Sequence, residues 1–437
     1  MKDTPINYEI VSKLIKESKI YNIGKASIRE VKKLIDNIEN ESGKKFIRME
    51  MGIPGLPANK LATEAEIEAL KKGVASVYPD VEGISVFKNE VSRFVKLFLD
   101  VDVNPQGCVP TTGSIEASLV SIITTARTDE KKNTTLLIDP GFPLHKQQCK
   151  MLGVNYECFD VYNYRGDKLK DKIESYLKKG NISSILYSNP NNPSWICFND
   201  KELKIIGDLA NKYNVFVFED LAYFGMDFRK NYSKPAQPPF QPTVAKYTDN
   251  YILLISCSKL FSYAGQRMGM MVISDKLFNL KIPNLLKYFT SDIFGIAITY
   301  GAVYYTTAGS THSTQYAIAA VLKACNDGKI NLIEEVREYG EKARIMKKMF
   351  TDNGFKIVYD KDEDVPIADG FYFTLSYPGF TGEELLVELF YYGISAISLT
   401  ITGSERTEGI RACVSLVDKN QFPELEYRLK RFKELHS

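Results

Sequence analysis

A lysine placed directly after an apolar run is the feature of this sequence best suited to chemistry. Lys259 follows the run Tyr251–Ile255, stands beside the hydroxyls of Ser256 and Ser258, and precedes Arg267 by eight residues. Burial disfavours a charged amine, so a lysine at the end of a core strand is costly unless it reacts or pairs. Hydroxyls and a guanidinium suit a phosphate group. These residues predict a lysine that forms a Schiff base with pyridoxal phosphate, and the alternative is a surface lysine after an ordinary strand.

Polar clusters follow three other apolar runs of the same kind. The clusters Asp139–Pro143, Ser188–Pro193 and Glu219–Tyr223 come at the ends of the runs Thr134–Asp139, Ile182–Ser188 and Val215–Glu219. Runs without polar alternation are typical of strands buried on both faces of a parallel sheet. Because ligands of open α/β sheets bind outside the carboxyl ends of the strands, we expect these clusters to converge on Lys259.

Composition excludes several classes of protein. The chain has 437 residues, 44% hydrophobic and 25% charged, with a net charge of +2, which is typical of a globular protein of about two domains. Near-neutral charge gives no reason to expect a nucleic-acid or membrane partner. The first residues lack the apolar core of a signal peptide, and no run has the length of a membrane span, so we expect a cytoplasmic protein.

Cysteine and histidine usage narrows the chemistry further. The seven cysteines are dispersed without a C-x-x-C pair, which favours reduced thiols. Only three histidines are present, so we expect neither a histidine-based zinc site nor a serine–histidine hydrolase; His145 is the one histidine kept as a candidate.

The remaining patterns predict a two-part α/β fold. Residues 8–48 are predicted to be helical with no strand, a capping-box pattern at Thr63–Glu66 opens a helix through Lys71, and residues 234–242 form a proline-rich loop. A charged helix is predicted over 331–350, and Phe371–Leu375 and Ile410–Leu416 are predicted strands of a smaller sheet. We expect a large domain with a mostly parallel central sheet flanked by helices over 51–325. The segments 1–50 and 326–437 would form a small α+β domain.

Four motifs, in order and at fitting distances, carry a family resemblance. They are Asn189–Pro193, Asp220–Tyr223, Ser256–Lys259 with Arg267–Gly269, and Gly409–Arg411. From about residue 48 to 417 the chain resembles the class I/II aminotransferases of the aspartate aminotransferase fold, which are fold-type I pyridoxal phosphate enzymes. The resemblance implies pyridoxal 5'-phosphate as cofactor and amino acid and 2-oxo acid substrates.

The resemblance also implies a role for each residue around the cofactor ring. Lys259 would form the Schiff base and move the proton of the substrate Cα, while Asp220 would keep the pyridine nitrogen protonated. Tyr223 and Asn192 would hydrogen-bond the phenolic oxygen, and Phe142 would stack on the ring. The alternatives are a helix N-cap for Asp220, a turn residue for Asn192 and plain core for Phe142.

The phosphate and the substrate would be held by separate groups. The phosphate would be bound by Gly113, Ser114, Ile115, Ser256, Ser258 and Arg267, the first three at a helix N-terminus. Arg411 would bind the substrate α-carboxylate with both of its outer nitrogens, aided by Gly52 and Asn192; its alternative is a salt-bridged strand arginine. Tyr78 and the segment Ser310–Gln315 resemble groups that act across a subunit interface, which implies a homodimer with shared active sites.

The chain departs from the family pattern in two places. After Asn192-Pro193 the family usually continues Thr-Gly, whereas here Ser194 and Trp195 follow, and Trp195 is the only tryptophan. No arginine lies between Arg267 and Arg337, where members specific for dicarboxylates place one. A neutral or aromatic amino acid is therefore favoured, although Lys281 or Lys287 could replace that arginine. The tyrosines at 300, 304 and 305 are compatible with a neutral or aromatic substrate side chain, and their alternative is a place in the core or an interface.

The function predicted from sequence is that of a pyridoxal phosphate-dependent aminotransferase. An alternative on the same fold is a β- or γ-lyase or an aminocyclopropane carboxylate synthase-like enzyme, because small changes around Cα select which bond breaks. A further alternative is a catalytically idle binding or regulatory protein, against which the retained Lys259, Asp220 and Arg411 speak.

Overall fold

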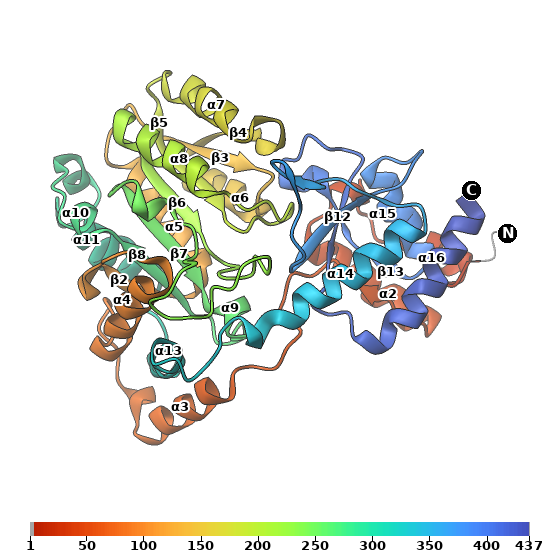
Figure 1. Ribbon diagram of the computed structural model, residues 1–437, viewed down its shortest axis with the longest axis horizontal. Coiled ribbons are helices and arrows are strands. Elements are labelled where there is room, and N and C mark those ends of the chain that lie inside the picture. The colour runs from red at the N-terminus through yellow and green to blue at the C-terminus, as the bar shows by residue number, and fades with distance from the viewer. Residues whose placement is uncertain (1–3, 437) are drawn as a thin grey trace.

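A seven-stranded sheet is the centre of the larger part of the molecule, which we describe from a computed structural model for residues 4–436 (Figure 1). The strands run in the order β2-β8-β7-β6-β5-β3-β4. All neighbours are parallel except β8, which is antiparallel to both β2 and β7. Their bounds are β2 Cys108–Thr111, β3 Thr134–Asp139, β4 Asn155–Asp160, β5 Ile182–Ser188, β6 Phe216–Asp220, β7 Tyr251–Ser256 and β8 Gly269–Ile273.

Helices cover the sheet because its strands are buried on both faces, as their apolar runs predict. Separate hydrophobic clusters lie on the two faces, one including Ile185 and Leu253 and the other including Leu186 and Leu254. The helices of this unit are α3 Lys60–Lys71, α4 Ser85–Leu99, α5 Gly113–Ala126, α6 Pro143–Leu152, α7 Asp167–Leu177, α8 Asp200–Tyr213, α9 Cys257–Leu260, α10 Asp275–Phe278, α11 Phe294–Ile296, α12 Tyr304–Thr307 and α13 His312–Asn326. A π-helical segment, η7 Ala297–Val303, joins α11 to α12.

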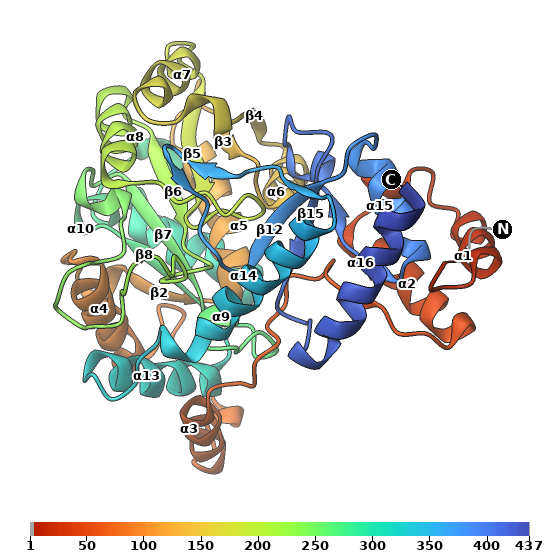
Figure 2. The same ribbon diagram turned by 45° about the vertical axis from the view of Figure 1, so that its right-hand side comes forward.

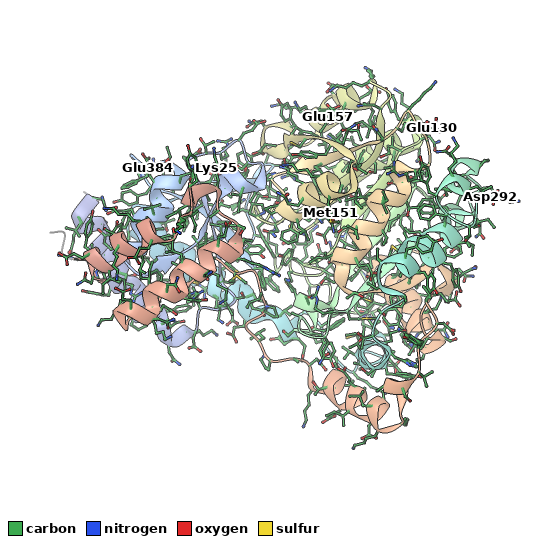
Figure 3. The ribbon with its side chains drawn as sticks, turned by 180° about the vertical axis from the view of Figure 1, so that it is seen from behind. Lys25, Glu130, Met151, Glu157, Asp292 and Glu384 are labelled. Carbon is green, nitrogen blue, oxygen red and sulfur yellow. The ribbon has the colours of Figure 1, made fainter. Side chains whose placement is uncertain are left out.

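The two ends of the chain fold together into a second unit (Figures 1 and 2). Its main sheet has the order β14-β15-β12-β9, and a separate pair joins β1 to β13. Figure 3 shows Lys25 and Glu384 close together on this unit, where Asn22 donates a hydrogen bond to Glu383 at 2.9 Å. The elements are α1 Tyr8–Glu17, α2 Ile28–Ser42, β1 Ile47–Arg48, α14 Arg337–Asp352, β9 Lys356–Ile357, β10 Lys361–Asp362, β11 Val365–Pro366, β12 Tyr372–Ser376, α15 Gly382–Tyr391, β13 Ile394–Ser395, β14 Ile397–Ser398, β15 Ile410–Cys413 and α16 Phe422–His436.

Three sequence predictions for local structure were wrong. Residues 8–48 are not wholly helical, because Ile47–Arg48 form β1, which pairs with β13 from the far end of the chain. Helix α3 begins at Lys60, since the Asn59 side chain accepts hydrogen bonds from its first turn ahead of the predicted capping box. Helix α14 begins at Arg337 rather than near residue 331, after a separate 3₁₀ turn.

Other expectations were confirmed. The mostly parallel sheet, the second smaller sheet and the loop over 234–242 are all present. All seven cysteines are free thiols. Within residues 4–436, no helix is both long and apolar enough to cross a membrane. The domain limits at residues 50 and 325 stay predictions.

Candidate active site

A cavity of about 250 Å³ lies where the carboxyl ends of the central strands meet β12 and β15 of the second unit. Nearly all of the predicted site residues line it: Gly52, Ser114, Ile115, Phe142, Asn192, Asp220, Tyr223, Ser256, Ser258, Lys259, Arg267 and Arg411. The four strand-end clusters therefore converge, as parallel strand ends must when they share one edge of a sheet. Two predicted residues, Gly113 and Tyr78, do not line this cavity.

Lys259 lies on α9, a single helical turn that directly follows β7. Ser256 caps this turn, because its hydroxyl oxygen accepts a hydrogen bond from the Ser258 N–H at 3.2 Å. Among the described residues, no hydrogen bond or ion pair holds the Lys259 amine. Burial lowers the pKa of this amine, and neighbouring Asp220 only partly opposes that effect. The lysine is thus a half-buried amine available for reaction.

Asp220 is the last residue of β6 and is 7% exposed. One of its carboxylate oxygens accepts a hydrogen bond from the Ala222 N–H at 3.1 Å. Burial raises the pKa of Asp220 to about 7, against the opposing effect of that hydrogen bond and of the Lys259 charge. A cationic partner would lower the pKa of this buried carboxyl group and so restore its ionised form.

The start of α5 forms a cradle for an anion. The N–H groups of Ser114 and Ile115, in the first helical turn, have no partner within a helix. Gly113 has φ +73°, and a Cβ there would lie 2.6 Å from Nη2 of Arg267, so only glycine lets the guanidinium approach the helix end. Arg267 donates one hydrogen bond to the Ala264 carbonyl at 3.0 Å. Its remaining N–H groups, with the two serine hydroxyls, suit a phosphate.

Arg411 stands on the opposite side of the cavity, on β15, and is 1% exposed. Its guanidinium donates to Asn192 Oδ1 at 3.4 Å and to the backbone carbonyl of Glu50. The same group lies over the Tyr372 ring, with Cζ 4.5 Å from the ring centroid. Its Nε–H has no acceptor among the described residues. A buried guanidinium without a carboxylate partner is costly, which points to an anionic ligand.

Sequence reasoning missed several residues that line the cavity, above all Tyr372 and Arg29. It also did not predict that His145 is buried in the cavity wall. His145 lies on α6 with its ring 5.7 Å from Phe142 in an edge-on contact, and burial lowers its pKa to about 4, so it is neutral. The three-residue spacing from Phe142, the N-cap residue, to His145 in the first turn of α6 could have linked these two rings. Arg29 and Tyr372 had no such signal, because they come from the second unit.

Residues predicted to act across subunits lie outside the cavity of their own chain. Tyr78 is 90% exposed. Gln315 is buried and bonded within the chain, since its side-chain oxygen accepts from the Ile84 N–H at 2.8 Å. Tyr300, Tyr304 and Tyr305 are exposed and also do not line the cavity. Their part in a shared site stays a prediction.

Comparisons with known proteins agree with this geometry. A probable aspartate aminotransferase of Methanocaldococcus jannaschii is 24% identical over 354 residues, which cover 76% of this chain and 88% of that protein. A (5-formylfuran-3-yl)methyl phosphate transaminase of the same organism is 24% identical over 429 residues, covering 95% and 98%. An alanine aminotransferase from Pyrococcus furiosus shares the fold with a TM-score of 0.75 at 20% identity, covering 93% and 97%.

Fold and site thus define a transaminase of class I/II. The family model for aminotransferase class I and II matches residues 45–423, and the chain belongs to that family.

Proposed function

We propose that this chain is a pyridoxal phosphate-dependent aminotransferase that moves an amino group between an L-amino acid and a 2-oxo acid through Lys259. The observation that carries the proposal is the meeting of three groups in one cavity. An amine without a partner on α9, a buried carboxyl at the end of β6 and a buried guanidinium on β15 all line it. Transamination needs an amine that moves the Cα proton, a carboxyl group beside the ring nitrogen of the cofactor and a cation for the substrate carboxylate.

The residues present fit the cofactor. The cradle at the start of α5, with Ser256, Ser258 and Arg267, would hold its phosphate. Asp220 would hold a proton on the ring nitrogen, and Tyr223 and Asn192 would hydrogen-bond the phenolic oxygen. Phe142 would exclude water from the ring face. When bound, pyridoxal phosphate supplies an aldehyde for the amine and a ring that withdraws electrons from the substrate Cα.

The protein's own groups then orient the substrate and move its proton. Arg411 binds the α-carboxylate bidentately and so fixes which bond at Cα is presented for cleavage. Lys259 Nζ, whose pKa burial lowers, takes up the Cα proton and gives it back. Gly52 lines the cavity, and a Cβ there would lie 2.0 Å from the Tyr372 hydroxyl oxygen, so its lack of a side chain leaves room for Tyr372.

We propose a neutral or aromatic amino acid as the preferred substrate. Apolar side chains form much of the cavity wall, namely Ile28, Met51, Ile53, Ile115 and Phe142. Burying an apolar substrate side chain against them is favourable by roughly 25 cal/mol per Å².

Arg29 supports a second candidate, a dicarboxylic amino acid. It lies in the first turn of α2, is exposed, lines the cavity and has no ion pair among the described residues. We expect Arg29→Gln to lower kcat/KM for glutamate about fivefold while leaving that for phenylalanine unchanged, since exposed ion pairs are weak. Lys25→Gln, on a nearby exposed lysine outside the cavity, is the matched control. Equal kcat/KM for glutamate in wild type and Arg29→Gln excludes this candidate.

We also propose a homodimer in which Tyr78 of one subunit reaches the phosphate of the other. The exposure of Tyr78 in a single chain supports this arrangement. Sedimentation analysis tests it, and a monomeric active enzyme would refute it.

A visible spectrum of the purified protein tests the proposed function. Pyridoxal phosphate bound through Lys259 gives an absorption band that a panel of amino acids should shift, each with release of its 2-oxo acid. A protein that takes up no pyridoxal phosphate contradicts the proposal. Release of ammonia from a single amino acid, with no acceptor present, would instead identify a lyase.

A further inference from the structure

Two buried tyrosine hydroxyls meet at the back of the cavity. The oxygens of Tyr223 and Tyr372 lie 2.7 Å apart, and either can be the donor. Tyr223 follows β6 in the large unit, while Tyr372 begins β12 in the second unit. Both line the cavity and are at most 4% exposed. The contact therefore joins the proposed cofactor site to β12, the strand that pairs with β15, on which Arg411 lies.

Trp195 holds both rings in place. The indole packs edge-on against Tyr223 with centroids 5.3 Å apart and against Tyr372 at 6.1 Å. It is fully buried and has φ +64°, where the family pattern usually has glycine. Gly370 makes room for it, because a Cβ at that position would lie 1.9 Å from Cε2 of the indole. The departure from the family pattern thus fixes the geometry of the two hydroxyls.

The number of protons on the two hydroxyls limits how many hydrogen bonds they can donate. Burial raises the pKa of both phenols, so both stay neutral at physiological pH and carry two protons together. One proton forms the hydrogen bond between the oxygens, and the other points away from the pair. The charge of Arg411, which lies over the Tyr372 ring, opposes the rise in the pKa of Tyr372. The same charge opposes the rise in the pKa of Tyr223, but less strongly, because the guanidinium lies directly over the Tyr372 ring. Tyr372 is therefore the better donor within the pair, which leaves the proton of Tyr223 free.

We propose that Tyr372 is a positioning residue: its hydroxyl donates to Tyr223 and so directs the Tyr223 O–H toward the phenolic oxygen of pyridoxal phosphate. This inference rests on the proposed function. Hydrogen bonds in a chain polarise one another, so Tyr223 donates more strongly when it also accepts from Tyr372.

The expected consequence is a change in the proton affinity of the linkage between Lys259 and the cofactor. A hydrogen-bond donor at the phenolic oxygen of the bound cofactor would stabilise negative charge there, and the Tyr223 O–H held by Tyr372 would be that donor. Tyr372 therefore lowers the pH at which the linkage deprotonates. A variant without the hydroxyl should deprotonate at higher pH.

The test is a titration of the visible band of the cofactor-loaded protein from about pH 5 to about pH 10. Tyr372→Phe keeps the ring under Arg411 and removes one oxygen; we expect its midpoint to rise by about half a pH unit, a roughly threefold change. Tyr223→Phe should raise the midpoint further, and adding Tyr372→Phe to it should change nothing more. Tyr187→Phe, a buried tyrosine outside the cavity, should leave the midpoint unchanged.

Several results would overturn the inference. An unchanged or lowered midpoint in Tyr372→Phe would show that Tyr372 does not strengthen the hydrogen bond that Tyr223 donates. If Tyr372→Phe raised the midpoint by the same amount in the Tyr223→Phe protein, Tyr372 would act independently of Tyr223. Should Tyr372→Phe fail to fold, Tyr372→Met also lacks the hydroxyl and must show the same upward shift. A wild-type protein without any visible band would refute the proposed function and this inference with it, whereas a normal band with an unmoved midpoint refutes the inference alone.

Discussion

Two of the regions that bury charged side chains, the cavity around Lys259 and a cluster around Asp362, differ in how those charges are paired. In the cluster each charge has a partner. The Asp362 carboxylate pairs with Arg165 and with Arg229, each at 2.7 Å, and Arg165 pairs in turn with Glu202 at 2.7 Å. In the cavity the Lys259 amine has no ion pair among the described residues.

Paired charges, as around Asp362, stabilise the fold, whereas an unpaired amine such as that of Lys259 remains free to contact a ligand. Asp362 lies on β10 of the second unit, and its arginine partners come from the large unit, so the cluster fastens the two units together. A buried charge with no partner costs stability, whereas a paired one is costly mainly when its partner is removed. Substitutions in the two regions should therefore have opposite effects on activity and on stability.

The largest expected effect is on activity, in Lys259→Ala. We expect transamination to fall by roughly 10⁴-fold or more, because both the nucleophile and the proton carrier are lost. The free energy of unfolding of the cofactor-free protein should be unchanged or higher, since an amine whose pKa burial lowers is removed. Steady-state kinetics and urea unfolding measure the two quantities.

The matched control for that variant is Lys342→Ala. Lys342 is more deeply buried than Lys259, with 4% of its surface exposed, and pairs with Glu338 at 2.8 Å, so its loss should lower stability and leave kcat unchanged. A Lys259→Ala protein that still transaminates would end the assignment of the cavity as the catalytic region.

The next effect is on stability, in Asp362→Asn. Removing this carboxylate leaves Arg165, whose side chain is buried, with Glu202 as its one carboxylate partner. The more exposed Arg229 keeps Asp227. We expect the free energy of unfolding to fall by about 2–3 kcal/mol. Activity at low temperature should be kept, because Asp362 does not line the cavity. Asp364→Asn, on the same hairpin but exposed, should change neither quantity. Equal stability of the two variants would mean that the cluster does not fasten the units.

The residues that line the cavity could be predicted from the sequence better than those of the cluster, for a physical reason. Strands buried on both faces leave long apolar runs, so β3 and β5 could be predicted residue for residue and their polar ends marked the cavity. The carboxylate Asp362, in contrast, stands in a two-residue strand among other charges, and nothing local distinguishes it from a solvated residue.

Contacts between the chain ends were also beyond prediction. Strand β1 consists of two residues that pair with residues 394–395, and neither segment has an apolar run of its own. Tyr372 could be predicted as a strand residue, but its contact with Tyr223 depends on how the two units pack. Only Trp195 gave a sign of that contact, as a departure from a family motif.

The smallest expected effect is a pH dependence that belongs to the cavity alone. The pKa of Asp220 is raised from 3.8 to about 7 by burial, so the folded cofactor-free protein holds this proton more tightly than the unfolded chain. The stabilisation is therefore complete below pH 3.8 and is lost as pH rises through about 7. A shift of this size sets an upper bound of about 4 kcal/mol, and relaxation around the carboxylate should reduce it to about 2 kcal/mol.

Asp220→Asn isolates this contribution. Between about pH 4.5 and about pH 8, wild type should lose about 2 kcal/mol of unfolding free energy relative to the variant, as measured by urea denaturation. His145, whose pKa burial lowers to about 4, changes protonation equally in both proteins and cancels from the difference. Bound pyridoxal phosphate should shrink the difference, because the ionised carboxylate then has a cationic partner. Parallel pH profiles in the cofactor-free proteins would mean that Asp220 is stabilised like the paired charges around Asp362, and the contrast between the two regions would fail.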